Sequence, residues 1–347
     1  MKNFFTNYLS TIAFILIAYI FYSEVPYYQG FLIKEISLHF ADFSINTKTI
    51  FHFIIVTYFI TLIPFYIKYK EKSKARIVIE SISKKFESLN YKINKIEKTA
   101  LLSWIVKLFF APLMIFWLAD HSFTLLNNIY FSYWDINLIS KDFLLFFNKH
   151  FFWLCFTAIL FFDVFFFTSG YLLESTWLKN KIKSVEPTLL WWWVAIIAYP
   201  PFNWFLTDII WWYSTDFPQF WNPTLHLILN FSIIILMSIY SWASISLWFK
   251  ASNLTNRWIV TKWPYRFVRH PAYICKNLAW FIWWLPLIIW NIMTGQIKDL
   301  FIVLFSLLAW SLIYYMRAIT EENHLRKDKD YLEYSKKVKY KFIPKVW

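Results

Sequence analysis

The chain has 347 residues, of which 59% are hydrophobic and 24% aromatic, whereas soluble domains are roughly half apolar. This composition excludes an ordinary soluble protein and indicates an integral membrane protein. The net charge of +14 does not indicate nucleic-acid binding, because the basic residues fall into short blocks between apolar runs. The two cysteines, Cys155 and Cys275, offer neither a disulfide framework nor metal-ligand spacing, so we expect no metal site.

Eight apolar runs predict an all-α, polytopic bundle of about eight transmembrane helices. About 20 helical residues cross the ~30 Å hydrocarbon core of a bilayer. No small-residue cleavage site follows the first run, which is typical of a retained helix rather than of a signal peptide. In chain order the runs cover residues 4–22, 50–67, 101–118, 143–168, 189–206, 224–249, 278–293 and 300–316.

The basic residues predict the orientation of the bundle. Of the 35 lysines and arginines, 28 lie in four alternate loops, 68–98, 179–183, 250–276 and 317–345. Lys and Arg concentrate on the cytoplasmic side of a membrane. We therefore expect a bacterial inner-membrane protein with both termini and the loop 250–276 in the cytoplasm.

The insertion at 68–100 is the one long polar segment of the N-terminal part. Apolar residues recur within it at spacings of three and four over 75–98, which predicts a single amphipathic helix. We expect this helix to lie on the inner leaflet, where anionic lipids favour each nearby Lys by about 1 kcal/mol. Pairing with a partner helix in a short coiled coil is the alternative.

Three later runs contain polar or proline residues that a simple membrane-spanning helix does not need. Asp163 lies deep in the fourth run, where a carboxylate is costly unless it faces a partner or a wet cavity. Pro200 and Pro201 interrupt the fifth run just before Asn203, and His226 lies in the sixth. We take Asp163, Asn203 and His226 as candidate substrate-site residues. A structural ion pair, a packing kink and an interhelical hydrogen bond are the respective alternatives.

The loop between the sixth and seventh runs is the strongest candidate for chemistry. It carries four arginines and lysines before its histidine and no acidic residue over 256–277. Its prolines restrict the backbone, because proline fixes its own φ and pushes the preceding residue out of the α region. The residues that we single out in this loop are Tyr265, Arg269, His270, Pro271 and Tyr273.

The last two runs form a helical hairpin that returns the chain to the same side of the membrane. Arg317 follows the hairpin 278–316, and Glu321 and Glu322 come about one turn later. The hairpin should therefore bring the basic, aromatic loop next to an acidic pair. A zwitterionic ligand with an amine, a carboxylate and a flat ring would suit this combination.

The string Arg-His-Pro-x-Tyr at Arg269 to Tyr273, followed across a hairpin by Glu321-Glu322, resembles the isoprenylcysteine carboxyl methyltransferase and phospholipid methyltransferase family of integral membrane enzymes. The resemblance covers residues 250–347 and implies that this region is catalytic. Residues 1–249 match only as membrane helices. The implied cofactor is S-adenosylmethionine, and the implied acceptor is a lipophilic substrate that enters from the bilayer.

The resemblance also implies roles for individual residues. His270, Pro271 and Tyr273, together with Tyr265, would line the cofactor, and Glu321 or Glu322 would bind its amine. Arg269 would position a carboxylate or an acidic substrate group. The implied catalytic residues are Arg269, His270 and Glu322.

Two other functions remain open. Sterol reductases resemble the same C-terminal arrangement but use NADPH, and the basic loop could accommodate its additional phosphate. A non-enzymatic lipid-binding or transport protein is the second alternative, in which Asp163, the Pro200-Pro201 kink and His226 line a path through the membrane. The arginines would then neutralise lipid phosphates, and the glutamates would pair with Arg317 and Lys337.

Glycine is unusually rare and tryptophan unusually common. The chain has 3 glycines and 22 tryptophans, although an average protein has about 7% glycine and membrane helices use more. Trp258 and Trp263 stand where the resembled family commonly has glycine. We hypothesise that the source organism reads the UGA codon as glycine, so that such positions are glycine in the natural protein. The alternative is a real enrichment of tryptophan at the membrane interface.

Overall fold

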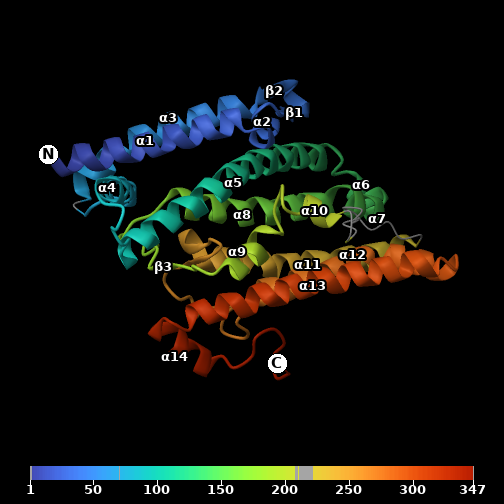
Figure 1. The fold of residues 1–347 in the computed structure, drawn as a ribbon. Helices are drawn as coiled ribbons and strands as arrows, with labels where there is room; N and C mark the ends of the chain where they lie inside the picture. Colours follow the sequence, from blue (N-terminus) through green and yellow to red (C-terminus); the bar gives the residue numbers. More distant parts are fainter. Residues whose placement is uncertain (1, 70, 208–209, 211–221, 347) are drawn as a thin grey trace.

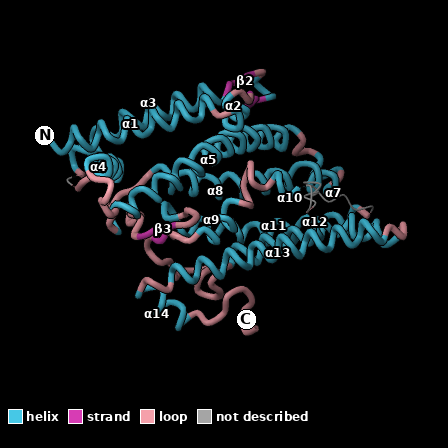
Figure 2. Tube along the Cα trace, in the orientation of Figure 1, coloured by secondary structure: helices cyan, strands magenta, loops and turns pink. Residues whose placement is uncertain are grey.

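The structure is a computed structural model that describes residues 2–69, 71–207, 210 and 222–346. Its long helices lie side by side along one main direction (Figure 1). Helix dominates the trace (Figure 2), and over the residues that the structure describes the strands form two short antiparallel pairs. These pairs are β1 (Glu35–Leu38) with β2 (Phe43–Asn46), and β3 (Ser184–Val185) with β4 (Thr255–Asn256).

Helices follow one another along the whole chain. The N-terminal part contains α1 (Lys2–Glu24), α2 (Pro26–Leu32), α3 (Thr47–Lys68), α4 (Lys74–Glu87), α5 (Lys95–Trp134), α6 (Leu138–Lys141), α7 (Phe143–Phe146), α8 (Phe152–Leu172), α9 (Leu189–Ile196) and α10 (Trp204–Thr207). The C-terminal part contains α11 (Pro223–Leu247), α12 (Pro271–Met293), α13 (Ile297–Leu325) and α14 (Lys329–Lys337).

Over the described residues, seven helical segments are long and apolar enough to cross a membrane. They are Asn3–Glu24, Thr47–Lys68, Lys95–Trp134, Phe143–Leu172, Pro223–Lys250, Pro271–Met293 and Ile297–Leu325. The prediction of an all-α, polytopic membrane protein is therefore confirmed. Seven such helices are present in the described part of the chain, where the sequence predicted about eight.

The difference lies in the fifth apolar run, 189–206. It forms the eight-residue helix α9, a turn through Pro200 and Pro201, and the short helix α10. Proline removes an amide donor and clashes with the preceding helical turn, so a continuous helix cannot pass through this pair. The segment still runs along the molecule, because Trp191 contacts His324 and Trp204 contacts Tyr27 near the start of α2.

The predicted amphipathic helix 75–98 is also shorter than expected. Helix α4 ends at Glu87, and a new helix, α5, begins at Lys95. The side chain of Asn94 accepts a hydrogen bond from the Glu97 amide, and the Glu97 carboxylate accepts one from the Asn94 amide. This capping box fixes the start of α5. The apolar side chains that gave the periodicity are exposed rather than packed on the bundle: Ile79, Ile82, Phe86, Leu89, Ile93 and Ile96.

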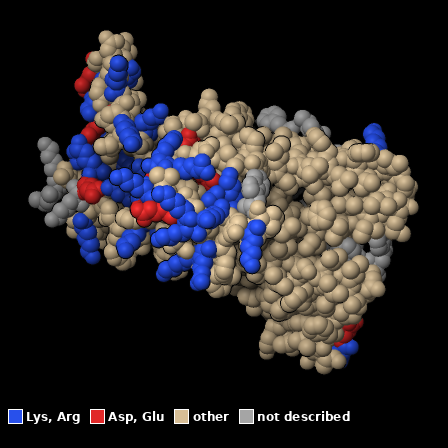
Figure 3. Space-filling view, turned by 90° about the horizontal axis from the view of Figure 1, so that it is seen from below, with Lys and Arg blue, Asp and Glu red and all other residues tan. Residues whose placement is uncertain are grey.

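Lysine and arginine gather at one end of the molecule, whereas the opposite end shows few charges on this face (Figure 3). The start of α1, the helix α4, the β3 strand and α14 all lie at the charged end (Figure 1). The alternate loops in which the sequence concentrates lysine and arginine therefore come together at one end of the fold.

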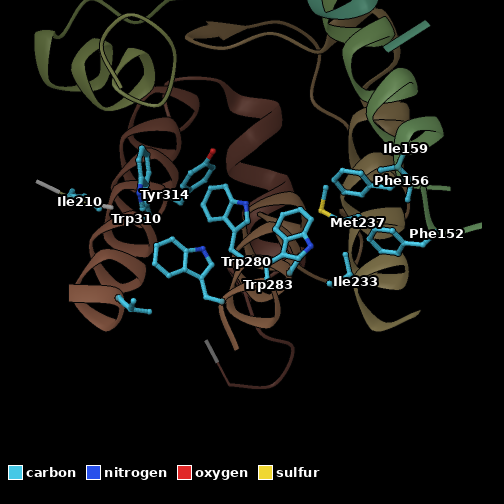
Figure 4. Close-up of a cluster of buried hydrophobic side chains, with 13 residues drawn as sticks. Phe152, Phe156, Ile159, Ile210, Ile233, Met237, Trp280, Trp283, Trp310 and Tyr314 are labelled. Carbon is cyan, nitrogen blue, oxygen red and sulfur yellow. The ribbon is translucent and has the colours of Figure 1, made fainter. Parts of the chain in front are cut away.

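Aromatic rings fill the core between the last two helices and the middle of the bundle. Trp280 and Trp283 of α12 pack with Tyr314 of α13, and this group continues to Phe152 and Phe156 at the start of α8 (Figure 4). The cluster fixes the hairpin α12/α13 against α8 and α11. It therefore fixes the position of the candidate site at the charged end of that hairpin.

Candidate functional site

The hairpin brings the motif loop and the acidic pair into contact, as their spacing predicted. His270 precedes α12, and Pro271 occupies the first helical position, where a missing amide donor costs nothing. Glu321 and Glu322 lie in the last turns of α13. The Nε2 atom of His270 is 3.1 Å from the Oε1 atom of Glu322.

Glu322 is a buried anion that several cations already hold. Its side chain is 2% exposed. Arg269 donates from Nε to Oε1 at 2.7 Å and from Nη2 to Oε2 at 3.4 Å. Arg326 and Lys341 lie 3.4 Å and 3.8 Å from Oε2. Because these partners occupy its oxygens, Glu322 stabilises the loop and is not available to a ligand.

Glu321 has a different environment from its neighbour. Its side chain is 34% exposed and lines a cavity. The Tyr273 hydroxyl donates to Glu321 Oε2 at 2.9 Å, and His270 Nδ1 lies 4.0 Å from the same oxygen. The rings of His270 and Tyr273 are parallel, with centroids 5.5 Å apart. Glu321 is therefore the member of the pair that can meet a bound molecule.

The C-terminal segment holds the motif loop in place. The backbone amides of Arg269 and His270 donate to the carbonyls of Tyr340 and Lys341 at 3.0 Å and 2.9 Å. The Arg269 guanidinium also donates to the Val338 carbonyl at 3.1 Å. Three hydrogen-bonding groups of two adjacent residues are thus satisfied by residues more than sixty positions later, which makes the loop a rigid part of the fold.

Tyr265 is a neutral phenol at the edge of the loop. The Tyr334 hydroxyl donates to the Tyr265 carbonyl at 2.7 Å. Burial raises the pKa of Tyr265 well above its usual value, and the negative charge of Glu321 raises it further. Its hydroxyl therefore stays protonated and can act as a hydrogen-bond donor.

A cavity of about 310 Å³ lies between this loop and the middle of the bundle. Small-molecule sites usually measure about 300–1,000 Å³, so the cavity is large enough for a small ligand. Residues of α5, α8, α9, α11, α12 and α13 contribute to its walls. The ionisable or hydroxyl-bearing residues among them are His121, Asp163, Tyr199, Tyr240, Ser244, Ser252, Thr255, Tyr265, Arg269, His270, Tyr273, Lys276, Tyr314, Arg317 and Glu321.

Two cations of the cavity wall lie over aromatic rings. The Lys276 Nζ atom is 5.3 Å from the ring centroid of Tyr240 and 5.6 Å from that of Tyr314. The Arg317 guanidinium is 5.0 Å from the Tyr314 centroid, and its Nη2 donates to Asn253 Oδ1 at 2.9 Å. A ring face attracts a cation but carries no net charge, so it does not neutralise the cation. The site therefore carries positive charge that can bind a carboxylate or phosphate.

Asp163 belongs to the same cavity. Its carboxylate accepts a hydrogen bond from the Tyr240 hydroxyl at 2.7 Å and another from the Ser244 hydroxyl. Asp163 thus has hydrogen-bond partners and faces a cavity rather than lipid, and these are the circumstances in which a carboxylate within a membrane is tolerated.

The other two substrate-site candidates lie elsewhere. Asn203 belongs to the turn between α9 and α10, and His226 lies in the first turn of α11. Neither residue lines the cavity. Of the three predicted substrate-site residues, only Asp163 lines the cavity. The other predicted site residues that line it are Tyr265, Arg269, His270, Pro271, Tyr273 and Glu321.

Sequence reasoning missed Lys276 and Tyr314 as cavity residues and treated Arg317 only as a possible ion-pair partner of the glutamates. Tyr314, Arg317 and Glu321 are spaced three and four apart on α13, and Tyr273 and Lys276 are three apart on α12. Such spacings place side chains on one helix face. Counting back from Glu321 by four and then by three residues along the predicted helix would have identified Arg317 and Tyr314 as neighbours on its face.

Comparison of this chain with protein-family models, with curated proteins and with solved structures finds no match.

Proposed function

We propose that this chain is a membrane-embedded methyltransferase that binds S-adenosylmethionine in the cavity and methylates a lipophilic acceptor. The observation that carries the proposal is that one cavity holds an acidic group, cationic groups and flat rings close together. Glu321 lies beside the parallel rings of His270 and Tyr273. The Arg317 guanidinium is 5.5 Å from the Tyr273 ring centroid, and Lys276 lies in the same wall. A zwitterion with an aromatic end matches this arrangement.

The side chains fit such a ligand. Glu321 can accept hydrogen bonds from an ammonium group, and Arg317 can donate to a carboxylate, in both cases with the strength of charge-assisted bonds. The flat walls of His270 and Tyr273 suit a purine ring. The volume of about 310 Å³ favours a ligand of this size over the much larger NADPH.

S-adenosylmethionine would supply an electrophilic methyl group, which moves to the acceptor by direct displacement at carbon. The aromatic walls of the cavity exclude water and restrict the approach of the acceptor. A carboxylate acceptor needs no base. For an amine or phenol acceptor, Asp163 or Glu321 would accept the proton, since both carboxylates line the cavity.

The orientation of the molecule follows from its charged end. We place that end, with both termini and the cavity entrance, in the cytoplasm, because lysine and arginine gather there (Figure 3). A water-soluble cofactor would then enter from the cytoplasm, and the acceptor would enter from the bilayer.

Ligand binding to the detergent-purified protein tests the proposal. We expect calorimetry to show saturable binding of S-adenosylhomocysteine and none of NADPH. Glu321→Gln should weaken that binding tenfold or more, because one charge-assisted hydrogen bond contributes about 1.5–3 kcal/mol. Its melting temperature should fall less than that of Glu322→Gln, since Glu321 is 34% exposed and a glutamine oxygen can still accept the hydrogen bond from Tyr273.

Two further variants separate binding from folding. Glu322→Gln should lower the melting temperature, because loss of one partner of a buried ion pair costs about 3–5 kcal/mol. Glu333→Gln, on the exposed face of α14, should change neither property. NADPH binding alone would transfer the assignment to the reductases. Binding of neither compound would leave lipid binding or transport as the function.

A further inference from the structure

A second cavity, of about 820 Å³, lies away from the candidate site. Its walls come from α1 and α3 on one side and α5 on the other. The helix pair α1/α3 is joined to the bundle at the charged end by α4, which packs on α1 and α5, and at the opposite end by α2, β1 and β2 (Figure 1). The cavity is the space that these two attachments hold open.

Most of the cavity wall is apolar and follows the helices. On α5 the wall extends from Lys95 to Ile115, which is about 30 Å at 1.5 Å per residue. Phe14, Ala18, Phe51 and Leu108 are among the residues that form it. This length and composition match an extended hydrocarbon chain rather than a compact polar molecule.

One end of the cavity carries an excess of buried positive charge. Lys74 forms an ion pair with Glu174, and Lys107 Nζ lies 3.0 Å from the other oxygen of the same carboxylate. The three side chains are only 18%, 17% and 12% exposed. Arg257 is close enough to influence Glu174 but donates to the backbone carbonyls of Asn180 and Gly170 instead. Glu174 is therefore shared by two lysines of the cavity wall and lies near a third cation, Arg257, outside that wall. A second carboxylate of the wall, Glu71, pairs with Lys181.

Additional lysines line the same end. Lys181 and Lys183 reach the cavity from the segment after α8, where each pairs with an acidic residue. Lys95, at the start of α5, is exposed and has no ion pair within the part of the chain that the structure describes. The buried lysines Lys74 and Lys107 share the single carboxylate of Glu174. Because buried charges are costly unless they are paired, this end of the cavity is suited to an anion.

We propose that this cavity is a binding site for an anionic phospholipid of the bilayer, with its phosphate at Lys74 and Lys107 and an acyl chain between the α1/α3 pair and α5. A free phosphate would satisfy the cations but leave the apolar wall uncovered. A neutral lipid would cover the wall but leave the excess charge. Only a molecule with both parts matches the whole cavity.

Thermal unfolding of the delipidated, detergent-purified protein tests this site, because a ligand that binds the folded state raises the melting temperature. The probes are phosphatidylglycerol, phosphatidylcholine with the same acyl chains, and glycerol phosphate. We expect phosphatidylglycerol to raise the melting temperature more than phosphatidylcholine, and glycerol phosphate to have no effect. The double variant Lys74→Gln/Lys107→Gln should lose the preference for phosphatidylglycerol.

The control Lys85→Gln removes an exposed lysine of α4 that does not line the cavity, and it should keep the preference. Ala18→Phe should fill part of the cavity next to its apolar wall and reduce the response to both lipids. This variant tests whether lipid binds in the cavity if the double variant does not fold. Equal responses to the two lipids in the wild-type protein would overturn the proposal. So would a response to glycerol phosphate alone, or an unchanged preference in the double variant.

Discussion

Trp248 adopts a backbone conformation that suits glycine. Its φ is 54° and its ψ −142°, a region that residues with a Cβ occupy at a cost of about 1–3 kcal/mol. The side chain is 52% exposed and contacts Phe166 and Phe249. A tryptophan gains little here that would offset the backbone cost. This position therefore supports the hypothesis that some tryptophans are glycines in the natural protein.

We expect Trp248→Gly to raise the free energy of unfolding by about 1 kcal/mol, because it relieves the backbone cost and loses only partly exposed ring contacts. Trp242→Gly is the matched control: it lies within α11 and should destabilise by about 1 kcal/mol through the low helix propensity of glycine. Thermal unfolding measures both. A UGG codon at Trp248, Trp258 and Trp263 would contradict the recoding hypothesis itself.

Lys74 provides a pH-dependent contribution to stability. Burial lowers its pKa from 10.5 to about 8, against the opposing attraction of Glu174. Between these two pH values the unfolded chain binds more protons at this side chain than the folded chain does. Its contribution to the free energy of unfolding therefore rises with pH across that window.

We expect the wild-type protein to gain stability relative to Lys74→Met as the pH rises from 8 to 10.5. Other titrating groups are shared by the two proteins, so their effects cancel in the difference. Melting temperatures of both proteins across this range measure the effect. A constant difference would show that Lys74 keeps an ordinary pKa, and a change in the opposite direction would show that folding raises its pKa.

The separate environments of Glu321 and Glu322 show what sequence reasoning could and could not predict at the level of residues. The spacing of the motif and the acidic pair was sufficient to predict that they meet across a hairpin. Successive side chains on a helix point about 100° apart, so one glutamate meets the loop and the other meets the cavity. Which one does so depends on the rotation of α13 about its axis, and no local pattern encodes that rotation.

At the level of elements, α8 approaches Ala251, four residues beyond the end of α11, so closely that only glycine fits at position 170. A Cβ atom on Gly170 would lie 2.0 Å from the carbonyl oxygen of Ala251. Arg257 also donates to the Gly170 carbonyl at 2.7 Å. This contact joins the end of α8 to the polypeptide that leads into the motif loop.

We expect Gly170→Ala to lower the free energy of unfolding by about 1–3 kcal/mol or more, because the neighbouring atom is backbone and cannot rotate away. Gly30→Ala is a suitable control, since a Cβ there meets nothing within 4 Å. That variant should change stability by less than about 1 kcal/mol. Equal melting temperatures for the two variants would mean that α8 and Ala251 can separate without cost.

Hydrophobic periodicity was a good guide to the long helices and a poor one to the interrupted segment. Seven of the eight predicted runs fall within observed spanning helices, because length and apolarity suffice for that prediction. The run 189–206 has the same composition, yet Pro200 and Pro201 prevent a continuous helix. Its path depends on contacts with other helices, such as that of Tyr199 with Phe110, which the local sequence does not contain.

At the level of the whole molecule, the concentration of lysine and arginine at one end leads to a labelling prediction. We expect cysteines introduced at Lys85 in α4 and Lys337 in α14 to be protected from a membrane-impermeant maleimide in intact cells. A cysteine at Gln296, between α12 and α13, should react. Variants in which Cys155 and Cys275 are replaced provide the background. Permeabilised cells, in which all three positions should react, provide the control.

If only one of the cysteines at positions 85 and 337 reacts in intact cells, the two positions lie on opposite sides of the membrane. That result would contradict this orientation. It would also mean that the segment 189–207 does not return the chain across the bilayer. Protection of all three positions would show instead that the reagent cannot reach the α12/α13 turn.

The interrupted path of α9 and α10 has a consequence for the biogenesis of the protein. Backbone groups within a bilayer need hydrogen-bond partners, and an eight-residue helix followed by a proline turn cannot supply all of them itself. This segment is therefore a poor independent unit for insertion during translation. A side-chain contact also ties it to a later part of the chain: the Asn253 side-chain amide, synthesised after α11, donates to the Tyr199 hydroxyl at 3.1 Å. Integration of the middle of the chain is thus coupled to later synthesis, and a ribosome that stalls before residue 253 would leave the segment without that support.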